Sequence, residues 1–341
     1  AQTAGSVLAV PKDTAPPAGY SLYKRSDRNS SLVWEEKAPV SVARAVFKGS
    51  AYLDEKIYLF GGTNSSDTNL DNLDSYDPLT NNWSLLEPMS VARKGLASSV
   101  LEGKIYAIGG QGLSSVEAYD PSTNTWSSRQ ALPSEVNHGA AVSFQGKIYL
   151  FGGRNSNDQQ IDQVLEYTPS TNQWLVKAPM PTARHGSVVL VHEEKIWVIG
   201  GFVSGETVSG VVEVYDPSTN SWSGKAAFPQ QMAWAAHWVQ NGKIVVAGGK
   251  THSASLDQIY KYNSLDNSWG QAGSLPFQIS YAGSVQNENT VYLISGSDGT
   301  SQTNKVFAAD ITPPMDLYFR DANASGGVTL DKFAGAVVSK L

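Results

Sequence analysis

Short apolar stretches alternate with polar turns along most of the chain, and this pattern predicts β-strands rather than helices. In the segment Lys195–Trp222, an apolar strand ends at Gly200-Gly201, a polar loop follows, and a second strand comes after it. Stretches such as Lys147–Phe151 are apolar at nearly every position, which is typical of strands that are covered on both faces. We therefore expect an all-β protein with strands stacked between neighbouring sheets.

This segment is one copy of a repeat with a period of 43 to 48 residues. Paired glycines lie at 61–62, 109–110, 152–153, 200–201 and 248–249, with a variant copy at Ser295-Gly296. Tyrosines 76, 119, 167, 215 and 262 are each followed seven residues later by tryptophans 83, 126, 174, 222 and 269. A fixed period built from short strands indicates repeated supersecondary units that stack on one another.

The order of double glycine, tyrosine and tryptophan resembles the Kelch motif, whose repeats form the four-stranded blades of a β-propeller. The resemblance covers about residues 31–311 and implies a six-bladed ring. It implies little about function, because Kelch propellers serve as enzymes, lectins, adhesins and protein-recognition modules. Within the repeat we expect tyrosine, tryptophan and glycine to be structural, the glycines letting a strand clear the large aromatic side chains.

The two ends of the chain each carry half a repeat. Leu32–Glu36 contains Trp34 without a preceding double glycine, and the last repeat ends at Lys305–Asp310 without a tryptophan. We expect Leu32–Glu36 to supply the outer strand of blade six, which leaves the ring without an open edge. Tyr20–Arg25 is expected to form a hairpin with it. Whether 305–310 or 20–25 provides the third strand of that blade stays open.

The domain division expected from these patterns is a 1–19 extension, a propeller over 20–311 and a 312–341 extension. The spacing predicts a short helix over Thr329–Leu341. Asp321, Asn323, Ser325 and Gly326 match the first half of a calcium loop, but Lys332 stands where a glutamate ligand should be, which argues against a calcium site. The final Ser339-Lys340-Leu341 matches a peroxisomal address, which we set aside in favour of an extracellular or cell-surface location.

Composition narrows the classes of partner. The net charge of −6 gives no reason to expect nucleic acid or an anionic membrane, and no apolar stretch is long enough for a membrane helix. The chain contains no cysteine, which excludes disulfides, thiolate metal sites and the cysteine–tyrosine chemistry of copper-radical oxidases with similar blades. It begins with Ala-Gln, as a chain cleaved by signal peptidase or trimmed for expression would. We expect a monomer without a cofactor or metal ion.

Candidate binding residues lie in two loop sets that Kelch-like propellers place on one face. One set joins each outer strand to the next inner strand, and the other joins the second strand to the third; the second set varies more in length, which favours binding there. Alignment on the double glycines places Arg44, Arg93, Asn137, Arg184, Met232 and Ile279 at nearly equivalent positions. The predicted ligand-binding residues are Arg44, Arg93, Asn137, His138, Arg154, Arg184, His185, Phe202, Trp234 and Tyr281.

Polar donors opposite an aromatic wall are the composition expected for a sugar site, and arginines could bind a carboxylate in bidentate fashion. The competing interpretation is that each arginine belongs to the repeat and packs its own loop. No hydrolase or phosphate-binding motif occurs. We expect a non-catalytic module that recognises carbohydrate or an extracellular protein. The alternatives are a mutarotase or epimerase, because sialic-acid mutarotases are similar six-bladed proteins, with His185, Glu206 and Arg184 as the nearest acid–base candidates, and an intracellular protein-recognition propeller.

Overall fold

The computed structural model describes residues 7–11, 20–25, 32–45, 48–312 and 315–320. Within these ranges the chain divides into two units, Ser31–Ile311 and a smaller unit from Ala1–Ser30 with Thr312–Leu341. No helix among the described residues is long and apolar enough to cross a membrane. The larger unit carries the candidate site.

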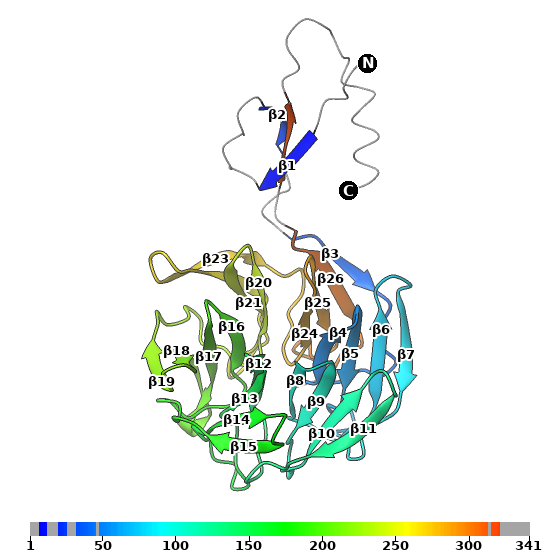
Figure 1. Ribbon diagram of the computed structural model, residues 1–341, viewed down its shortest axis with the longest axis vertical. Coiled ribbons are helices and arrows are strands. Elements are labelled where there is room, and N and C mark those ends of the chain that lie inside the picture. Colours follow the sequence, from blue (N-terminus) through cyan, green and yellow to red (C-terminus); the bar gives the residue numbers. More distant parts are fainter. Residues whose placement is uncertain (1–6, 12–19, 26–31, 46–47, 313–314, 321–341) are drawn as a thin grey trace, which may run out of the picture. The chain divides into compact units, whose positions relative to one another are not determined.

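Six four-stranded antiparallel sheets form the blades of this unit, numbered one to six along the chain and seen around the ring in Figure 1. Blade one contains β4 (Ser50–Leu53), β5 (Lys56–Phe60), β6 (Leu73–Asp77) and β7 (Asn82–Leu86). Blade two contains β8 (Ala97–Leu101), β9 (Lys104–Ile108), β10 (Val116–Asp120) and β11 (Thr125–Arg129). Blade three contains β12 (Ala140–Phe144), β13 (Lys147–Phe151), β14 (Val164–Thr168) and β15 (Gln173–Val176).

Blade four contains β16 (Val188–His192), β17 (Lys195–Val203), β18 (Thr207–Asp216) and β19 (Ser221–Gly224), with a 3-10 turn, Ser204–Glu206, between β17 and β18. Blade five contains β20 (Ala236–Gln240), β21 (Lys243–Ala247), β22 (Gln258–Asn263) and β23 (Ser268–Ser274). Blade six contains β24 (Gly283–Gln286), β25 (Thr290–Ile294), β26 (Val306–Asp310) and, from the start of the chain, β3 (Trp34–Lys37). The predicted all-β, six-bladed architecture is confirmed.

Closure of the ring by an N-terminal outer strand is also confirmed. β3 pairs antiparallel with β26, with Trp34 opposite Ala309 and Lys37 opposite Val306. β26 is therefore the third strand of blade six, which answers the question left open between 305–310 and 20–25.

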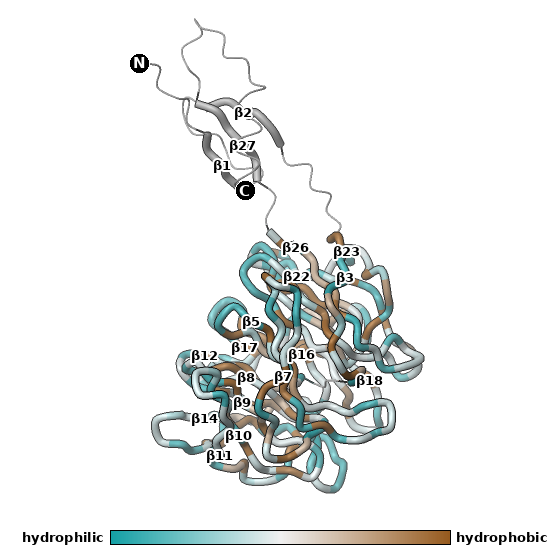
Figure 2. The backbone as a smooth tube through the Cα atoms, turned by 90° about the vertical axis from the view of Figure 1, so that its right-hand side faces the viewer, coloured by the Kyte–Doolittle hydropathy of each residue, from teal (hydrophilic) through white to brown (hydrophobic). Residues whose placement is uncertain are grey.

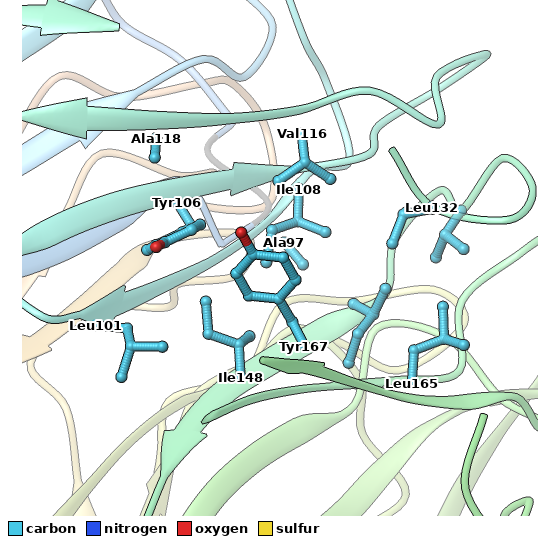
Figure 3. Close-up of a cluster of buried hydrophobic side chains, with 12 residues drawn as sticks. Ala97, Leu101, Tyr106, Ile108, Val116, Ala118, Leu132, Ile148, Leu165 and Tyr167 are labelled. Atoms are coloured by element: carbon cyan, nitrogen blue, oxygen red, sulfur yellow. The ribbon is translucent and has the colours of Figure 1, made fainter. Parts of the chain in front are cut away.

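Apolar side chains from adjacent blades interlock to form the core. Between blades two and three, Tyr106, Ile108 and Val116 pack against Leu165 and Tyr167 in one buried cluster (Figure 3). Equivalent clusters lie between the other blades, so the second strand of each blade is covered on both faces, as its sequence predicted. Along the backbone the hydrophobic stretches coincide with the strands, whereas many connecting loops are hydrophilic (Figure 2).

The repeat tyrosine and tryptophan clamp neighbouring blades together, which confirms that they are structural. In blade four, Trp222 Nε1 donates to the carbonyl oxygen of Ala178, which follows the outer strand of blade three, at 3.0 Å. The backbone N–H of Ala178 donates to Asn220 Oδ1 at 2.9 Å, and Tyr215 Oη donates to the same oxygen at 2.7 Å. The same clamp recurs with Trp83, Trp126, Trp174 and Trp269.

The double glycine has a different neighbour from the one predicted. A Cβ on Gly200 would lie 2.5 Å from the carbonyl oxygen of Met232 in the next blade, and Gly200 has φ +63°. Gly201, at φ +104°, donates its N–H to that same carbonyl oxygen at 2.9 Å. A Cβ on Gly201 would lie 2.7 Å from the carbonyl oxygen of His185 in its own blade. The first glycine is therefore required by the backbone of the next blade and the second by that of its own blade, not by the packed aromatic rings. In blade six Ser295 replaces the first glycine, and its hydroxyl donates to the carbonyl oxygen of Arg44 at 2.9 Å.

The smaller unit contains a three-stranded sheet in the order β1 (Val7–Pro11), β27 (Met315–Arg320), β2 (Tyr20–Arg25). The expected hairpin between Tyr20–Arg25 and Leu32–Glu36 does not form, because β2 pairs with β27 instead. The expected boundary at residue 20 is accordingly replaced by a division near residue 31. The predicted helix over Thr329–Leu341, the calcium-like loop at 321–332 and the final three residues lie outside the described residues.

Candidate functional site

The two predicted loop sets do meet on one face of the propeller. Single β-bridges join a residue of the outer-to-inner loop to a residue of the second-to-third loop: Ala45 to Thr63, Asn137 to Arg154, His185 to Phe202, Ala233 to Lys250, and Ser280 to Ser297. The second residue of each pair directly follows the double glycine of its blade. Five of the six blades therefore present one residue from each set at the same place, and in blade two the N–H of Gln111 donates to the carbonyl oxygen of Lys94 at 2.9 Å.

Three of the predicted binding arginines point into the blades instead of the face. Arg44, Arg93 and Arg184 are 0%, 0% and 1% exposed. Each donates from Nη2 to a carboxylate on the third strand of its own blade at 2.6 Å; the partners are Asp74, Glu117 and Glu213. These guanidinium groups are consequently unavailable to a ligand. They agree with the competing interpretation, in which each arginine belongs to the repeat and packs its own loop.

The sequence alignment of these positions was also shifted by one residue in blade three. The second glycine of each blade donates to the carbonyl oxygen of Arg44, Arg93, Val136, Arg184, Met232 or Ile279 in the next blade. Val136, not Asn137, is therefore the counterpart of the arginines. Leu165 has the same strand position in blade three as Glu213 has in blade four. Val136 and Leu165 belong to one apolar cluster. Blade three therefore has an apolar contact in place of the ion pair.

A series of four backbone hydrogen bonds crosses from blade to blade between blades six and two. The N–H of Tyr281 donates to the carbonyl oxygen of Trp234, Trp234 to Gly186, Gly186 to His138, and His138 to Gly95, at 2.7 to 3.3 Å. All five residues have positive φ, between 51° and 66°. For tryptophan and tyrosine this backbone conformation is uncommon and strained, and strain of this kind concentrates at functional sites.

Glycine and bulky residues alternate in this series from Gly95 to Trp234, and Tyr281 follows Trp234. The indole of Trp234 occupies the space above Gly186, where a Cβ would lie 2.7 Å from the indole Nε1. His138 lies in the same way over Gly95. The missing side chains of the glycines thus make room for the rings of the following blade, which turns those rings toward one another.

The outcome is an aromatic group, here called the mouth cluster, of His138, His185, Phe202, Trp234 and Tyr281. The ring centres of Trp234 lie 4.5 Å from Tyr281, 4.7 Å from Phe202 and 5.6 Å from His185. Phe202 and His185 are buried beneath, whereas Trp234 and Tyr281 remain half-buried. All five were predicted as binding residues from the sequence, and the fold brings them together.

Both histidines of the mouth cluster are neutral at physiological pH. Burial, with a smaller contribution from Arg154, lowers the pKa of His138 to about 4 and that of His185 to about 3. Burial also raises the pKa of Tyr281 to about 12. An uncharged imidazole pair beneath aromatic rings can exchange hydrogen bonds with a ligand but supplies no acid for catalysis near neutral pH.

Unpartnered polar atoms lie beside these rings. Neither Asn137 Oδ1 nor His185 Nδ1, both buried, has a hydrogen-bond partner among the described residues. Buried polar groups are nearly always paired, so such atoms indicate a water molecule or a ligand. Asn137 lines a cavity of about 520 Å³ together with His138 and charged residues of blades one to three, whereas His185 is not part of its lining.

Most of the charged side chains at the rim of this cavity already form ion pairs. Arg154 donates to Asp158 at 2.8 Å and also to Glu206, which accepts a further bond from Gln160 Nε2 at 2.7 Å. Lys94 pairs with Asp67 at 2.8 Å. Lys250 differs, because its ammonium lies 5.4 Å from the centre of the Tyr281 ring, within range of a cation–π contact.

Lys250 is a residue that the sequence reasoning missed. Its position is that of Arg154 and Phe202 in blades three and four, the first residue after the double glycine. The residue that follows the double glycine in each repeat therefore indicates Arg154, Phe202 and Lys250 together. Among the described residues no group of three histidine, aspartate or glutamate side chains is arranged to hold a metal ion.

Comparison with known families and proteins gives the following matches. Residues 118–274 match the KLHDC2/KLHL20/DRC7 Kelch-repeats domain, and residues 44–90 and 92–133 match the Kelch motif. Kelch-like protein 33 of Homo sapiens is 34% identical over 120 residues, 33% of this chain and 21% of that protein. Kelch-like ECH-associated protein 1A of Danio rerio is 36% identical over 70 residues, 20% of this chain and 12% of that protein.

The chain is also similar to a solved structure titled "Structure of YjhT", with a TM-score of 0.68 and 19% sequence identity, covering 80% of this chain and 96% of that one. At that identity the likeness concerns the fold alone. The matched segments span about a fifth or less of the length of the two Kelch-like relatives named above.

Proposed function

Because the chain belongs to the Kelch-repeat β-propellers, which present variable loops on a regular scaffold, we propose that it is a non-catalytic binding module that recognises a carbohydrate at the mouth cluster. The observation that carries the proposal is the pair Trp234 and Tyr281, held 4.5 Å apart in strained backbone. A sugar ring has apolar faces that stack on aromatic side chains and hydroxyls that need polar partners around the edge.

The neighbouring polar groups suit the hydroxyl edge of such a ligand. Asn137 Oδ1 can accept a hydrogen bond, and His185 Nδ1 can donate or accept one according to its tautomer. Arg154 already carries two carboxylate partners, and the three arginines of blades one, two and four are buried. The proposal therefore favours a neutral, hydroxyl-rich glycan over the acidic glycan that converging arginines would have selected. A secreted or cell-surface location belongs to this proposal.

The test is a glycan array with the whole chain, followed by titration calorimetry with each sugar that binds. Trp234→Ala should weaken binding about 5- to 150-fold, since stacking on one aromatic ring is worth about 1–3 kcal/mol by analogy with base stacking. His252→Ala, an exposed change in the second-to-third loop of blade five, serves as the control and should leave binding unchanged. Melting temperatures verify that both variants are folded.

Two outcomes would overturn the proposal. Turnover of a free sugar without retention on the array would favour the mutarotase or epimerase alternative. The second outcome is that the chain binds no sugar but captures a protein, and that the Trp234→Ala variant still binds this protein. A protein partner is the second candidate because the names of two relatives, Kelch-like ECH-associated protein 1A and the influenza virus NS1A-binding protein homolog, state protein partners.

A further inference from the structure

A separate cavity of about 400 Å³ lies along the axis of the propeller. Its lining comes from β4, β8, β12, β16, β20 and β24, the inner strands that surround the middle of the ring in Figure 1, and from Lys48 just before β4. It extends to Gln286, the last residue of β24, so it reaches the end of the channel away from the mouth cluster. None of the mouth cluster residues lines it.

Most polar side chains in this cavity already join neighbouring inner strands. Ser284 Oγ donates to the carbonyl oxygen of His237 at 2.7 Å and accepts from its backbone N–H at 3.1 Å. Gln286 forms the same two-way contact with the backbone of Val239. The hydroxyls of Ser99 and Ser143 lie 2.5 Å apart. These groups hold the inner strands together and leave little hydrogen-bonding capacity for a ligand.

Two side chains in the lining are not used in this way. His237 Nδ1 is buried and has no hydrogen-bond partner among the described residues. The Lys48 ammonium makes no ion pair with any described residue, and no aspartate or glutamate lines the cavity. Both residues are only half-buried by surface area because they face the cavity itself. A cation without a counter-ion beside an unpaired imidazole nitrogen makes the cavity favourable for an anion.

The protonation states of Lys48 and His237 are consistent with an anion in this cavity. Burial lowers the pKa of Lys48 to about 8, so its ammonium is mostly charged at neutral pH. Burial, followed by the positive charge of Lys48, lowers the pKa of His237 to about 3, so the imidazole is neutral and the two groups do not repel each other. Lys48 and His237 are the titratable side chains among the residues that line the cavity.

We propose that the axial cavity binds a small aliphatic carboxylate, whose charged end pairs with Lys48 and accepts a hydrogen bond from His237 Nδ1. The half-buried side chains of Val142, Val191 and Val239 line the remaining wall and suit a short hydrocarbon chain. This site is distinct from the mouth cluster, so it does not depend on the proposed carbohydrate function.

Butyrate is a suitable probe, with butyramide as a neutral molecule of the same shape. Calorimetric titration at pH 7 and constant ionic strength should show butyrate binding and butyramide binding at least tenfold more weakly. Lys48→Met should reduce butyrate affinity at least tenfold, whereas Lys48→Arg should retain most of it. Lys243→Met, at the exposed start of β21, is the control and should bind as the parent does.

A second measurement uses the parent chain alone and so does not depend on how a variant folds. Butyrate affinity should fall as pH rises from 7 to 9, because the Lys48 ammonium loses its proton through about pH 8. In turn, bound butyrate should raise the pKa of Lys48, which the lysine Cε resonance reports by NMR. Equal binding of butyrate and butyramide, affinity unchanged in Lys48→Met, or affinity independent of pH in this range would each overturn the proposal.

Discussion

At the scale of single residues, the buried guanidinium groups depend on one carboxylate each. Arg184 and Glu213 lie 2.6 Å apart and are 1% and 7% exposed, so water cannot replace either partner. Breaking such a pair on one side usually costs more than replacing both partners by apolar groups. Blade three illustrates the second case, with Val136 and Leu165 at the corresponding positions.

Replacing only the acid should therefore be the more damaging change. Glu213→Leu leaves Arg184 buried without a counter-charge and should lower the free energy of unfolding by about 3–5 kcal/mol. Combining it with Arg184→Met should restore part of that loss. Urea denaturation of the parent, the single variant and the double variant measures both effects. A double variant less stable than the single one would contradict this account of the pair.

Gly200, the first glycine of the pair in blade four, should not tolerate an apolar side chain, unlike blade six, where the Ser295 hydroxyl at this position bonds to the facing carbonyl oxygen. Gly200→Ala would place a methyl group 2.5 Å from the carbonyl oxygen of Met232 at a positive φ, which should cost at least about 2 kcal/mol. Gly224→Ala is the matched control, because no atom lies within 4 Å of its added Cβ. Thermal melts compare the two, and similar melting temperatures would refute the role given to the double glycine.

Because the histidines of the mouth cluster are neutral in the folded chain, the free energy of unfolding should fall in mild acid. The pKa of His185 is about 3 in the folded chain and 6.5 for an ordinary histidine. As pH drops below 6.5 the unfolded chain binds the proton first, so the stability contributed by the neutral ring is full above 6.5 and declines below it. Between pH 6.5 and 4.5 its share of the slope approaches about 1.4 kcal/mol per pH unit.

His185→Phe should reduce that slope by this amount while keeping an aromatic ring against Phe202. Denaturation curves at several pH values between 4.5 and 6.5 provide the measurement. An unchanged slope would mean that folding does not lower the pKa of His185.

At the scale of the elements, the sequence predicted the blades well because the repeat residues act on their nearest structural neighbours. Tyr215, Asn220 and Trp222 are close in sequence and together bind the end of the preceding blade. The arginines were harder to interpret, since Glu213 lies 29 residues from Arg184 and only the paired strands bring them together. The mouth cluster was predicted because its residues lie in or beside the loops, but the series of backbone hydrogen bonds between the blades has no signature in residue types.

The contact between blades five and six lacks the clamp found elsewhere. Trp34 Nε1 has no hydrogen-bond partner among the described residues, whereas Trp174 Nε1 donates to the carbonyl oxygen of Gln130 at 2.9 Å. Trp34 instead packs edge-on against Trp238 and Phe277.

Phenylalanine keeps the ring of these tryptophans and removes the donor. Trp174→Phe should therefore cost about 1 kcal/mol more than Trp34→Phe in free energy of unfolding. Chemical denaturation of the two single variants tests the difference. A larger loss for Trp34→Phe would show that its indole nitrogen does contribute to the contact.

At the scale of the whole molecule, the propeller should fold without the smaller unit provided that β3 is kept. A chain of residues 32–311 retains all four strands of blade six, whereas a chain of 38–311 loses β3 and Trp34 and exposes the edge of β26. We expect the first to melt cooperatively within several degrees of the parent. The second should lose at least about 3 kcal/mol, the usual cost of removing a packed tryptophan.

Circular dichroism melts of the two truncated chains decide the matter. Equal melting temperatures would show that β3 adds nothing to the ring. Both truncated chains lack the smaller unit, so a difference between their melting temperatures reports the contribution of β3 alone.

The pairing of β2 with β27 has a consequence for how the ring stays shut. Arg25 lies opposite Asp316 in the smaller unit; Arg25 is nine residues before the start of β3, and Asp316 is six residues after the end of β26. The β2–β27 pairing holds the two chain ends together and so raises the effective concentration of β3 at β26. Without this pairing, β3 and β26 could meet only by closing a loop as long as the whole ring, which costs more conformational entropy. After a transient opening, blade six should thus re-form by an intramolecular search among near neighbours.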